Sequence, residues 1–110
     1  MELVIRPARM NDLKEIWNLL HANQISWTDA RIIAELPKLR VMQRDSKILG
    51  VLNGYFEAKV LKIEWVAIHP LYPEKQLREA MIEGFCAIFG LDRGEKKKVL
   101  SNYELALELE

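Results

Sequence analysis

The order of apolar and polar residues predicts five strands and three helices in this chain. Short apolar runs bounded by turn residues predict strands over residues 3–5, 39–43, 48–56, 60–68 and 98–101. Apolar residues at helical spacing predict helices over residues 12–21, 28–36 and 77–89. Short turns join the three middle strands, so we expect these strands to form an antiparallel meander.

A strand that runs directly into a helix is the most informative feature of the pattern. The apolar run over residues 63–68 stops at His69 and Pro70, because a proline cannot continue the hydrogen-bonded ladder. The apolar stripe of the helix that follows consists of Leu77, Ala80, Met81, Gly84, Phe85, Ile88 and Phe89. Such a junction leaves unpaired N–H groups at the positive end of the helix dipole, and it can therefore hold a phosphate.

Cap residues mark the limits of the predicted helices. Asp12, with Glu15 three residues later, predicts a capping box at the start of the first helix. Either Ser26 or Thr28 caps the second helix, and Gly90 is well placed to end the third.

Some parts of the predicted sheet are less regular. Gly50 and Gly54 mark weak points or bulges in the strand over residues 48–56. The tail over residues 103–110 alternates apolar and acidic residues, so its period favours a strand while its composition favours a helix. We expect the strand over residues 98–101 to lie beside the one over 60–68, joined through the long helix as a right-handed crossover.

The composition is that of a single soluble domain over residues 1–110. The 16 basic and 16 acidic residues balance, so we expect no binding to nucleic acid or to an anionic membrane. The absence of a signal peptide and of a long apolar run favours the cytoplasm. The single cysteine, Cys86, is expected to be a packed thiol, and we expect no metal cluster.

The strand-to-helix junction resembles the signature of the GNAT family of N-acetyltransferases. That signature is a strand ending in Val-x-Pro, then a tyrosine or similar residue, then Arg/Gln-x-x-Gly-x-Gly/Ala at the start of a helix. The corresponding residues here are Ala67, Ile68, His69, Pro70, Tyr72, Lys75, Ala80, Met81 and Ile82. The family's opening strand and first helix are matched by Val4, Ile5, Arg6, Pro7, Ala8, Asp12, Leu13, Ile16, Trp17 and Leu20. The resemblance covers the chain from Leu3 to about Ser101.

This resemblance implies an α+β fold with a mixed sheet, the GNAT-like acyl-CoA N-acyltransferase fold, in which a crossover helix follows the antiparallel meander. Family members usually continue with another helix and a final hairpin, so the C-terminal part is expected to be truncated. Tyr103 comes too soon after the last strand to match the tyrosine that often protonates the departing thiolate. An incomplete sheet leaves an open edge, and the tail has an apolar face to cover, so we expect a homodimer.

The resemblance also implies a site for acetyl-CoA. Backbone groups of Val66, Ala67 and Ile68 would hold the pantetheine arm and polarise the thioester carbonyl. The pyrophosphate would lie over the start of the long helix, at Glu74, Lys75, Gln76, Leu77 and Arg78. Glu64, the only acidic residue of its strand, is the candidate base for an amine acceptor, and the alternative is a partly exposed glutamate without a catalytic role.

Strand parity and aromatic content add two expectations about this region. Parity places Glu64 on the face of Val66 and Ile68, opposite Ile63 and Trp65. The three tryptophans, Trp17, Trp27 and Trp65, are all expected to pack in the core. Alternatively, Trp27 lines an acceptor pocket, as the corresponding loop does in the family.

Several residues depart from the family signature and leave two functions open. Gln76 and Arg78 stand where small residues normally let the backbone approach a pyrophosphate, and Pro73 removes one N–H group. Lys75 and Arg78 can still attract phosphate as charges, while Lys62 replaces a glutamate that many relatives carry. The first function is a weak N-acetyltransferase that moves an acetyl group from acetyl-CoA to a small-molecule amine. The second is a degenerate, non-catalytic binding or assembly module with the same fold.

Overall fold

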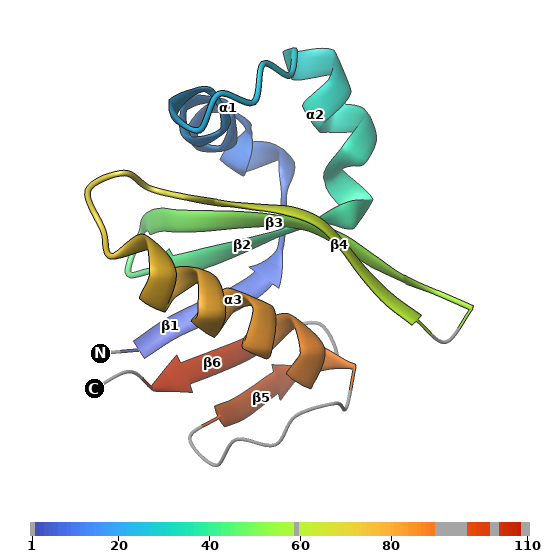
Figure 1. Cartoon of the computed structure of the whole chain (residues 1–110), viewed down its shortest axis with the longest axis vertical. Helices are drawn as coiled ribbons and strands as arrows, with labels where there is room; N and C mark the ends of the chain where they lie inside the picture. Colours follow the sequence, from blue (N-terminus) through green and yellow to red (C-terminus); the bar gives the residue numbers. More distant parts are fainter. Residues whose placement is uncertain (1, 59, 90–96, 102–103, 109–110) are drawn as a thin grey trace.

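A six-stranded sheet forms the centre of the computed structural model, which describes residues 2–58, 60–89, 97–101 and 104–108 (Figure 1). Its strands are β1 (Glu2–Pro7), β2 (Leu39–Arg44), β3 (Lys47–Glu57), β4 (Val60–Ile68), β5 (Lys97–Ser101) and β6 (Glu104–Glu108). They lie in the order β4-β3-β2-β1-β6-β5, and each pair of neighbours is antiparallel. The predicted α+β class and the β2–β3–β4 meander are confirmed.

Three helices cover the two faces of this sheet. The first two, α1 (Leu13–Ala22) and α2 (Asp29–Glu35), lie on one face, and α3 (Glu74–Ile88) lies on the other (Figure 1). Short 3-10 helices, η1 (Met10–Asp12) and η2 (Leu36–Lys38), connect them to the strands. Thr28, one of the two predicted caps, accepts a hydrogen bond on Oγ1 from the Arg31 amide at 3.2 Å.

Two apolar clusters hold the helices to the sheet, and they contain the largest buried side chains. The cluster under α3, the α3-side core, contains Leu3, Ile5, Met42, Leu49, Leu52, Val66, Ile68, Leu77, Ala80, Met81, Phe85 and Ala87. The cluster under α1 and α2, the α1-side core, contains Ile16, Leu19, Leu20, Ile32, Leu39, Val41, Ile48, Val51 and Ala67. The buried stripe predicted for the long helix is confirmed at Met81 and Phe85, which are almost fully buried.

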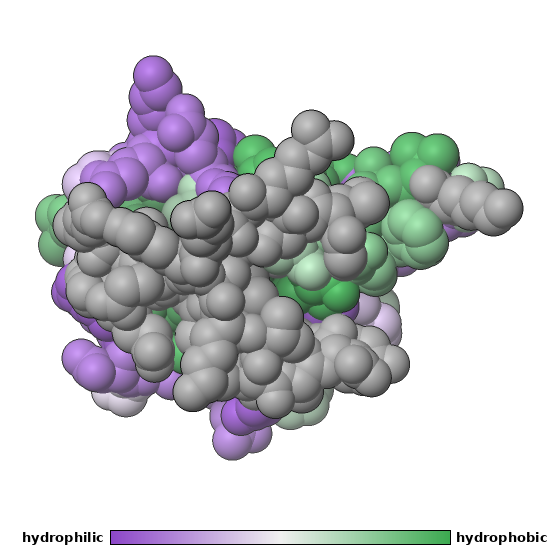
Figure 2. All heavy atoms as spheres, turned by 90° about the horizontal axis from the view of Figure 1, so that it is seen from below, coloured by the Kyte–Doolittle hydropathy of each residue, from purple (hydrophilic) through white to green (hydrophobic). Residues whose placement is uncertain are grey.

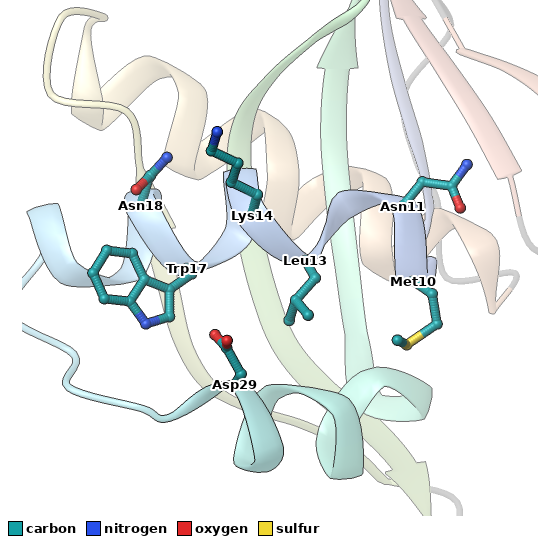
Figure 3. A pocket seen from close by; sticks show the side chains of 7 residues that line it. All are labelled: Met10, Asn11, Leu13, Lys14, Trp17, Asn18 and Asp29. Atoms are coloured by element: carbon teal, nitrogen blue, oxygen red, sulfur yellow. The ribbon is translucent and has the colours of Figure 1, made fainter.

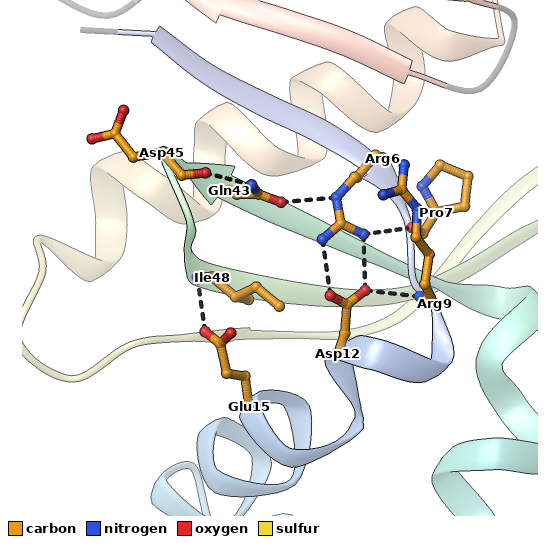
Figure 4. Close-up of polar contacts among 8 residues, drawn as sticks. All are labelled: Arg6, Pro7, Arg9, Asp12, Glu15, Gln43, Asp45 and Ile48. Carbon is orange, nitrogen blue, oxygen red and sulfur yellow. Dashed lines mark hydrogen bonds and ion pairs between the residues drawn. The ribbon is translucent and has the colours of Figure 1, made fainter.

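The polar residues at the start of α1 are arranged differently from the predicted capping box (Figure 4). Asp12 accepts hydrogen bonds from the Arg6 guanidinium at 2.8 and 2.9 Å and from the Arg9 amide at 2.8 Å. Glu15 instead accepts from the Ile48 amide at 3.1 Å. The prediction that Asp12 and Glu15 cap one helix is wrong, because both carboxylates are used to tie α1 to the sheet.

The two glycines of β3 lie beside irregularities of the sheet, as predicted. The register shifts once between Met42 and Gln43, next to Gly50, and once between Asn53 and Gly54. A Cβ atom on Gly54 would lie only 2.8 Å from the carbonyl oxygen of Lys62. The close approach of two backbones therefore requires glycine at this position.

The C-terminal strands pair differently from the prediction. Strand β5 lies at the opposite end of the sheet from β4, so the predicted crossover pairing of these two strands is wrong. The tail forms strand β6, one of the two alternatives, and β6 pairs with β1 and with β5. It is therefore not a lone edge strand that needs another chain. Gly90 and Tyr103 lie outside the described residues.

The hairpin of β3 and β4 extends beyond the rest of the molecule (Figure 1). Its outer part forms an apolar surface, which Figure 2 shows at the right of the molecule. Phe56 is 47% exposed and Val60 is 53% exposed. Phe56 also stacks on Phe89, with ring centroids 5.2 Å apart, which connects the hairpin to the end of α3.

Candidate functional site

Strand β4 is one edge of the described sheet, and part of its backbone points outward. The His69 amide donates a hydrogen bond to the Leu49 carbonyl at 2.8 Å, which fixes the alternation of the β3–β4 ladder. Opposite residues of antiparallel strands alternate between pairs that exchange hydrogen bonds and pairs that do not. Val66 and Ile68 therefore turn their N–H and C=O groups toward the open edge, whereas Ala67 turns them toward β3.

The end of this edge is joined to α1 by an asparagine. The Asn23 side-chain amide donates to the Ile68 carbonyl at 3.0 Å and to the Leu19 carbonyl at 2.9 Å. One of the outward-facing carbonyls of β4 is thus already used. The groups left for a ligand are the N–H and C=O of Val66 and the N–H of Ile68, and no other described strand lies along this edge.

A β-bulge at Glu64 changes the direction of the side chains of β4. Trp65 lies opposite Asn53 and Ile63 lies opposite Gly54, so Glu64 is the extra residue. Ile63 packs against the α3-side core, whereas Trp65 packs against the α1-side core. The prediction that Ile63 and Trp65 share one face is therefore wrong, because an inserted residue reverses the alternation.

The bulge also moves Glu64 to a different face from the predicted one. Glu64 is the bulged residue between Ile63 and Trp65, and we infer from the bulge that it projects to the α1 side with Trp65, away from Val66 and Ile68. Its side chain is exposed, and no ion pair or hydrogen bond to it is found among the described residues. Its role as a base stays a prediction.

Asn53 is a polar residue of the bulge that was not predicted from the sequence as a site residue. It is only 2% exposed, and its Oδ1 atom has no hydrogen-bond partner among the described residues. Val51 belongs to the α1-side core and Leu52 to the α3-side core, so Asn53 also projects to the α1 side. The bulge thus gathers Glu64, Trp65 and Asn53 on one face.

The tryptophans divide between the core and the surface. Trp27 and Trp65 are half-buried against the α1-side core, and their rings meet edge to face with centroids 5.3 Å apart. The Arg31 guanidinium lies 4.4 Å from the centroid of Trp27. Trp17 is 38% exposed and stacks on His21, so the expectation that all three pack in the core is wrong for Trp17. An acceptor role for Trp27 stays a prediction.

A group of cations surrounds Tyr72 in the loop between β4 and α3. Arg44 donates from Nη2 to the Tyr72 hydroxyl at 3.4 Å and lies 5.4 Å from its ring centroid. The Lys47 ammonium lies 5.6 Å from the same ring, and His69 meets it edge to face at 5.2 Å. We call Tyr72, Arg44, Lys47 and His69 the Tyr72 cluster. An aromatic ring that holds cations in this way concentrates positive charge where β4 ends.

The first turn of α3 adds groups that suit an anion. The first intrahelical bond runs from the Leu77 amide to the Pro73 carbonyl at 3.1 Å, so the N–H groups of residues 74–76 precede it. Lys75 is exposed, whereas Arg78 pairs with Glu74 at 2.6 Å. The side chain of Leu77 is buried in the core, so only its backbone can face a ligand. The attraction of a phosphate to this turn therefore depends on the charge of Lys75 more than on that of Arg78.

Two cavities lie on the α1 side of the molecule. The smaller one, of about 220 Å³, is beside the Tyr72 cluster and is lined by Glu15, Asn18, Leu19, Ala22, Lys47, Ile48, His69 and Pro70. The larger one, of about 560 Å³, lies between α1 and the start of α2, where Met10, Leu13 and Trp17 extend toward Asp29 (Figure 3). None of the predicted site residues lines either cavity. We place the candidate site along the open edge of β4, beside the smaller cavity, because Lys47 and His69 of the Tyr72 cluster line that cavity.

The structure thus brings together only part of the predicted set. Val66 and Ile68 lie on the same open strand, and residues 74–76 lie one turn beyond its end. Arg44, Lys47, Asn23 and Asn53 join them from other elements, and none of these four was predicted from the sequence. The only sequence signal for Asn53 was that this polar residue directly follows the apolar run 48–52. Arg44 and Lys47 flank the turn between β2 and β3. Charged residues are common at turns, so they gave no sequence signal for a site.

Other candidate chemistry of the sequence is absent from this site. Cys86 is a free, half-buried thiol on α3. The described residues contain no group of three or more His, Cys, Asp or Glu residues placed to hold a metal ion. None of the helices within the described ranges is both long enough and apolar enough to cross a membrane.

Comparison with known proteins supports the fold. No family model and no curated protein sequence matches the chain. Among solved structures it is similar to N-acetylglutamate synthase from Neisseria gonorrhoeae, determined in complex with coenzyme A and N-acetyl-glutamate. The TM-score is 0.66 at 16% sequence identity, over 86% of this chain and 24% of that chain. The chain therefore has a GNAT-like fold and spans about a quarter of the length of that enzyme.

Proposed function

We propose that the chain binds acetyl-CoA along the open edge of β4 and transfers its acetyl group to an amine. The pantetheine arm pairs with the outward-facing backbone of Val66 and Ile68. The pyrophosphate lies over the first turn of α3, next to the Tyr72 cluster. The coenzyme A bound by the structurally similar synthase supports this choice of ligand, and the GNAT-like fold agrees with it.

The residues at the bulge supply the groups that acyl transfer needs. The amine nitrogen attacks the thioester carbonyl carbon, a C–N bond forms, and the C–S bond breaks. The N–H of Val66 stabilises the charge that develops on the carbonyl oxygen. Glu64 takes one proton from the amine, and the departing thiolate acquires one proton from solvent, so the charges balance.

The observation that carries this proposal is the position of the cations relative to the open backbone. Val66 and Ile68 expose hydrogen-bonding groups on a strand whose end lies beside Arg44, Lys47 and His69. Thioesters of coenzyme A combine an amide-containing arm with a highly anionic end, so they match both features. The cations of the Tyr72 cluster also offset the missing glycines of the family signature.

Release of free thiol from acetyl-CoA in the presence of a mixture of primary amines tests the transfer step. The proposal requires amine-dependent thiol release and an acetylated product of matching mass. Glu64→Gln should lower the rate by about a hundredfold, since a general base typically contributes 10²–10⁴-fold. Release that does not depend on the amine, or that Glu64→Gln leaves unchanged, contradicts the assigned chemistry.

The second candidate function is a binding or assembly module without turnover. The pairing of Arg78 with Glu74 and the side chain at Gln76 favour it, because both crowd the place where the family exposes bare backbone. This module would bind acetyl-CoA and release no thiol. The same two measurements, binding and thiol release, therefore separate the candidates.

A homodimer is also proposed, although the tail is not an unpaired strand that another chain must cover. Strand β6 already has β1 and β5 as neighbours, so the outer strands of the described sheet are β4 and β5. The exposed Phe56 and Val60 place apolar surface next to the β4 edge. We expect light scattering at tens of micromolar to give twice the chain mass of 12.8 kDa. A mass of one chain contradicts the proposal.

A further inference from the structure

Among the described residues, the Oδ1 atom of Asn53 is the one buried side-chain polar atom that has no hydrogen-bond partner. A buried polar atom without a hydrogen bond destabilises the folded state, so most proteins avoid such an arrangement. The other buried polar residues named in this fold, Arg6 and Asp12, are bonded to each other. The exception at Asn53 therefore points to a group that arrives from outside.

The position of Asn53 says where that group would be. It stands on β3 directly opposite Trp65, and Glu64 is the bulged residue next to Trp65. All three project to the α1 side of the sheet. On that face Trp65 is the β4 residue opposite Asn53, it lies on the edge strand of the described sheet, and it is half-buried. A small ligand that enters from the edge would reach the amide by displacing the indole of Trp65, which Trp27 contacts edge to face.

We propose that Asn53 orients the acceptor and restricts it to primary amines, an inference that rests on the proposed acetyl transfer. A neutral primary amine has two N–H bonds and one lone pair. Glu64 accepts one N–H, and Asn53 Oδ1 accepts the other. The lone pair is then directed at the thioester carbonyl, beside the outward-facing N–H of Val66. Asn53 is thus a specificity-determining residue of the acceptor site.

The same geometry predicts discrimination against secondary amines. An N-methyl substituent replaces the hydrogen that Asn53 would accept and leaves the buried oxygen unpaired again. Sites built to hydrogen-bond a polar group reject analogues that lack it, because the protein group is left without a partner. The half-buried rings of Trp27 and Trp65 nearby favour an apolar carbon skeleton on the amine.

The proposal also predicts an unusual effect on stability. Replacing Asn53 with leucine removes the unpaired oxygen and keeps the branched shape and the number of heavy atoms of the side chain. If the amide serves only a ligand, Asn53→Leu raises the thermal midpoint of the free protein. If the amide has an unseen structural role, the same variant lowers it. Val51→Ala, two residues earlier and on the same face, is the control for ordinary loss of packing and should lower the midpoint.

The experiment compares benzylamine with N-methylbenzylamine as acceptors for acetyl-CoA. In the native protein, kcat/KM should favour the primary amine by about tenfold or more, as expected when one buried hydrogen bond is lost. In Asn53→Leu this preference should fall to about twofold or less, while the affinity for acetyl-CoA is unchanged. A preference that survives in Asn53→Leu, or a variant that unfolds at lower temperature, overturns the proposal.

A second readout separates this inference from the proposed transfer. Benzylamine is titrated into the protein without acetyl-CoA, and the side-chain amide signals of Asn53 are followed by nuclear magnetic resonance. A shift that N-methylbenzylamine does not produce supports the acceptor site even if no acetyl group is transferred. If acetyl-CoA binds but neither amine moves these signals, the assignment of Asn53 fails while the cofactor site stands.

Discussion

Two polar regions at different places in the sheet differ in how completely their groups are paired. At the start of α1, which we call the Arg6–Asp12 corner, Asp12 accepts from Arg6 and Arg9, and Arg6 also donates to Gln43 and Pro7. Along β4, the bulge holds a buried amide oxygen without a partner among the described residues, and open backbone groups lead from there to the cations at the end of the strand. Satisfied polar networks make a structure rigid, whereas unsatisfied ones are retained where a ligand completes them. The Arg6–Asp12 corner therefore has a structural role, and the end of β4 is the candidate site.

A change in the apolar core gives the reference value for the loss of stability expected in either polar region. Phe85 is 1% exposed in the α3-side core, and it also contacts Phe89. We expect Phe85→Ala to lower the free energy of unfolding by about 3–5 kcal/mol in urea denaturation, because a large cavity is left under α3. A loss below about 1 kcal/mol would show that this helix face contributes little to the core.

Substitutions in the Arg6–Asp12 corner should change the stability of the fold. Asp12→Asn removes the charge that compensates the buried Arg6 guanidinium, and we expect a loss of about 3–5 kcal/mol in urea denaturation. The double variant Arg6→Met, Asp12→Leu should cost clearly less, because no unpaired charge remains. Equal costs for the two variants would contradict the idea that pairing, rather than packing, holds the corner.

The same ion pair predicts how stability changes in acid. Burial alone would raise the pKa of Asp12, but hydrogen bonds from Arg6 and Arg9 and their charges outweigh it and lower the pKa below 3.8. A lowered pKa means that the folded state favours the carboxylate, so this stabilisation is complete above the ordinary value and is lost as the pH falls below it. The native protein should therefore lose more stability below pH 3.8 than Asp12→Asn does.

Substitutions in the first turn of α3 should have a smaller effect, on the affinity for acetyl-CoA and not on stability. Lys75→Ala with Arg78→Ala should weaken acetyl-CoA by about 1–3 kcal/mol, as for lost charge-assisted hydrogen bonds. Conversely, Gln76→Gly with Arg78→Gly should improve binding if the side chains block the pyrophosphate. Calorimetric titration measures both. Unchanged affinity in the alanine pair would place the phosphate elsewhere.

Local features of the fold could be read from the sequence because they depend on neighbouring residues. The stripe through Met81 and Phe85, the cap at Thr28 and the irregularities at Gly50 and Gly54 follow from spacing and backbone preference. Alternation also indicated that the tail can form a strand. It could not name β1 as its partner, because the period of a strand fixes its faces and not its neighbours.

The candidate site was harder to predict because it depends on register. A single inserted residue, Glu64, reverses the faces of β4, and no pattern in a nine-residue strand shows this. Arg44 and Lys47 reach Tyr72 only because the β2–β3 turn lies beside the end of β4. The unpaired state of Asn53 is a property of its surroundings, so it becomes visible only in three dimensions.

The most direct test of the proposed site is calorimetric titration of acetyl-CoA into the native chain and into Arg44→Ala, Lys47→Ala. Lys14→Ala, at the larger cavity, is the matched control. The proposed site requires that the native chain binds one equivalent of acetyl-CoA with micromolar affinity. The double variant should bind about tenfold more weakly or worse, and tenfold corresponds to about 1.4 kcal/mol. The control should bind with unchanged affinity. Absence of binding, or equal affinity in the native chain and the double variant, would contradict the assignment of the β4 end as an acyl-CoA site.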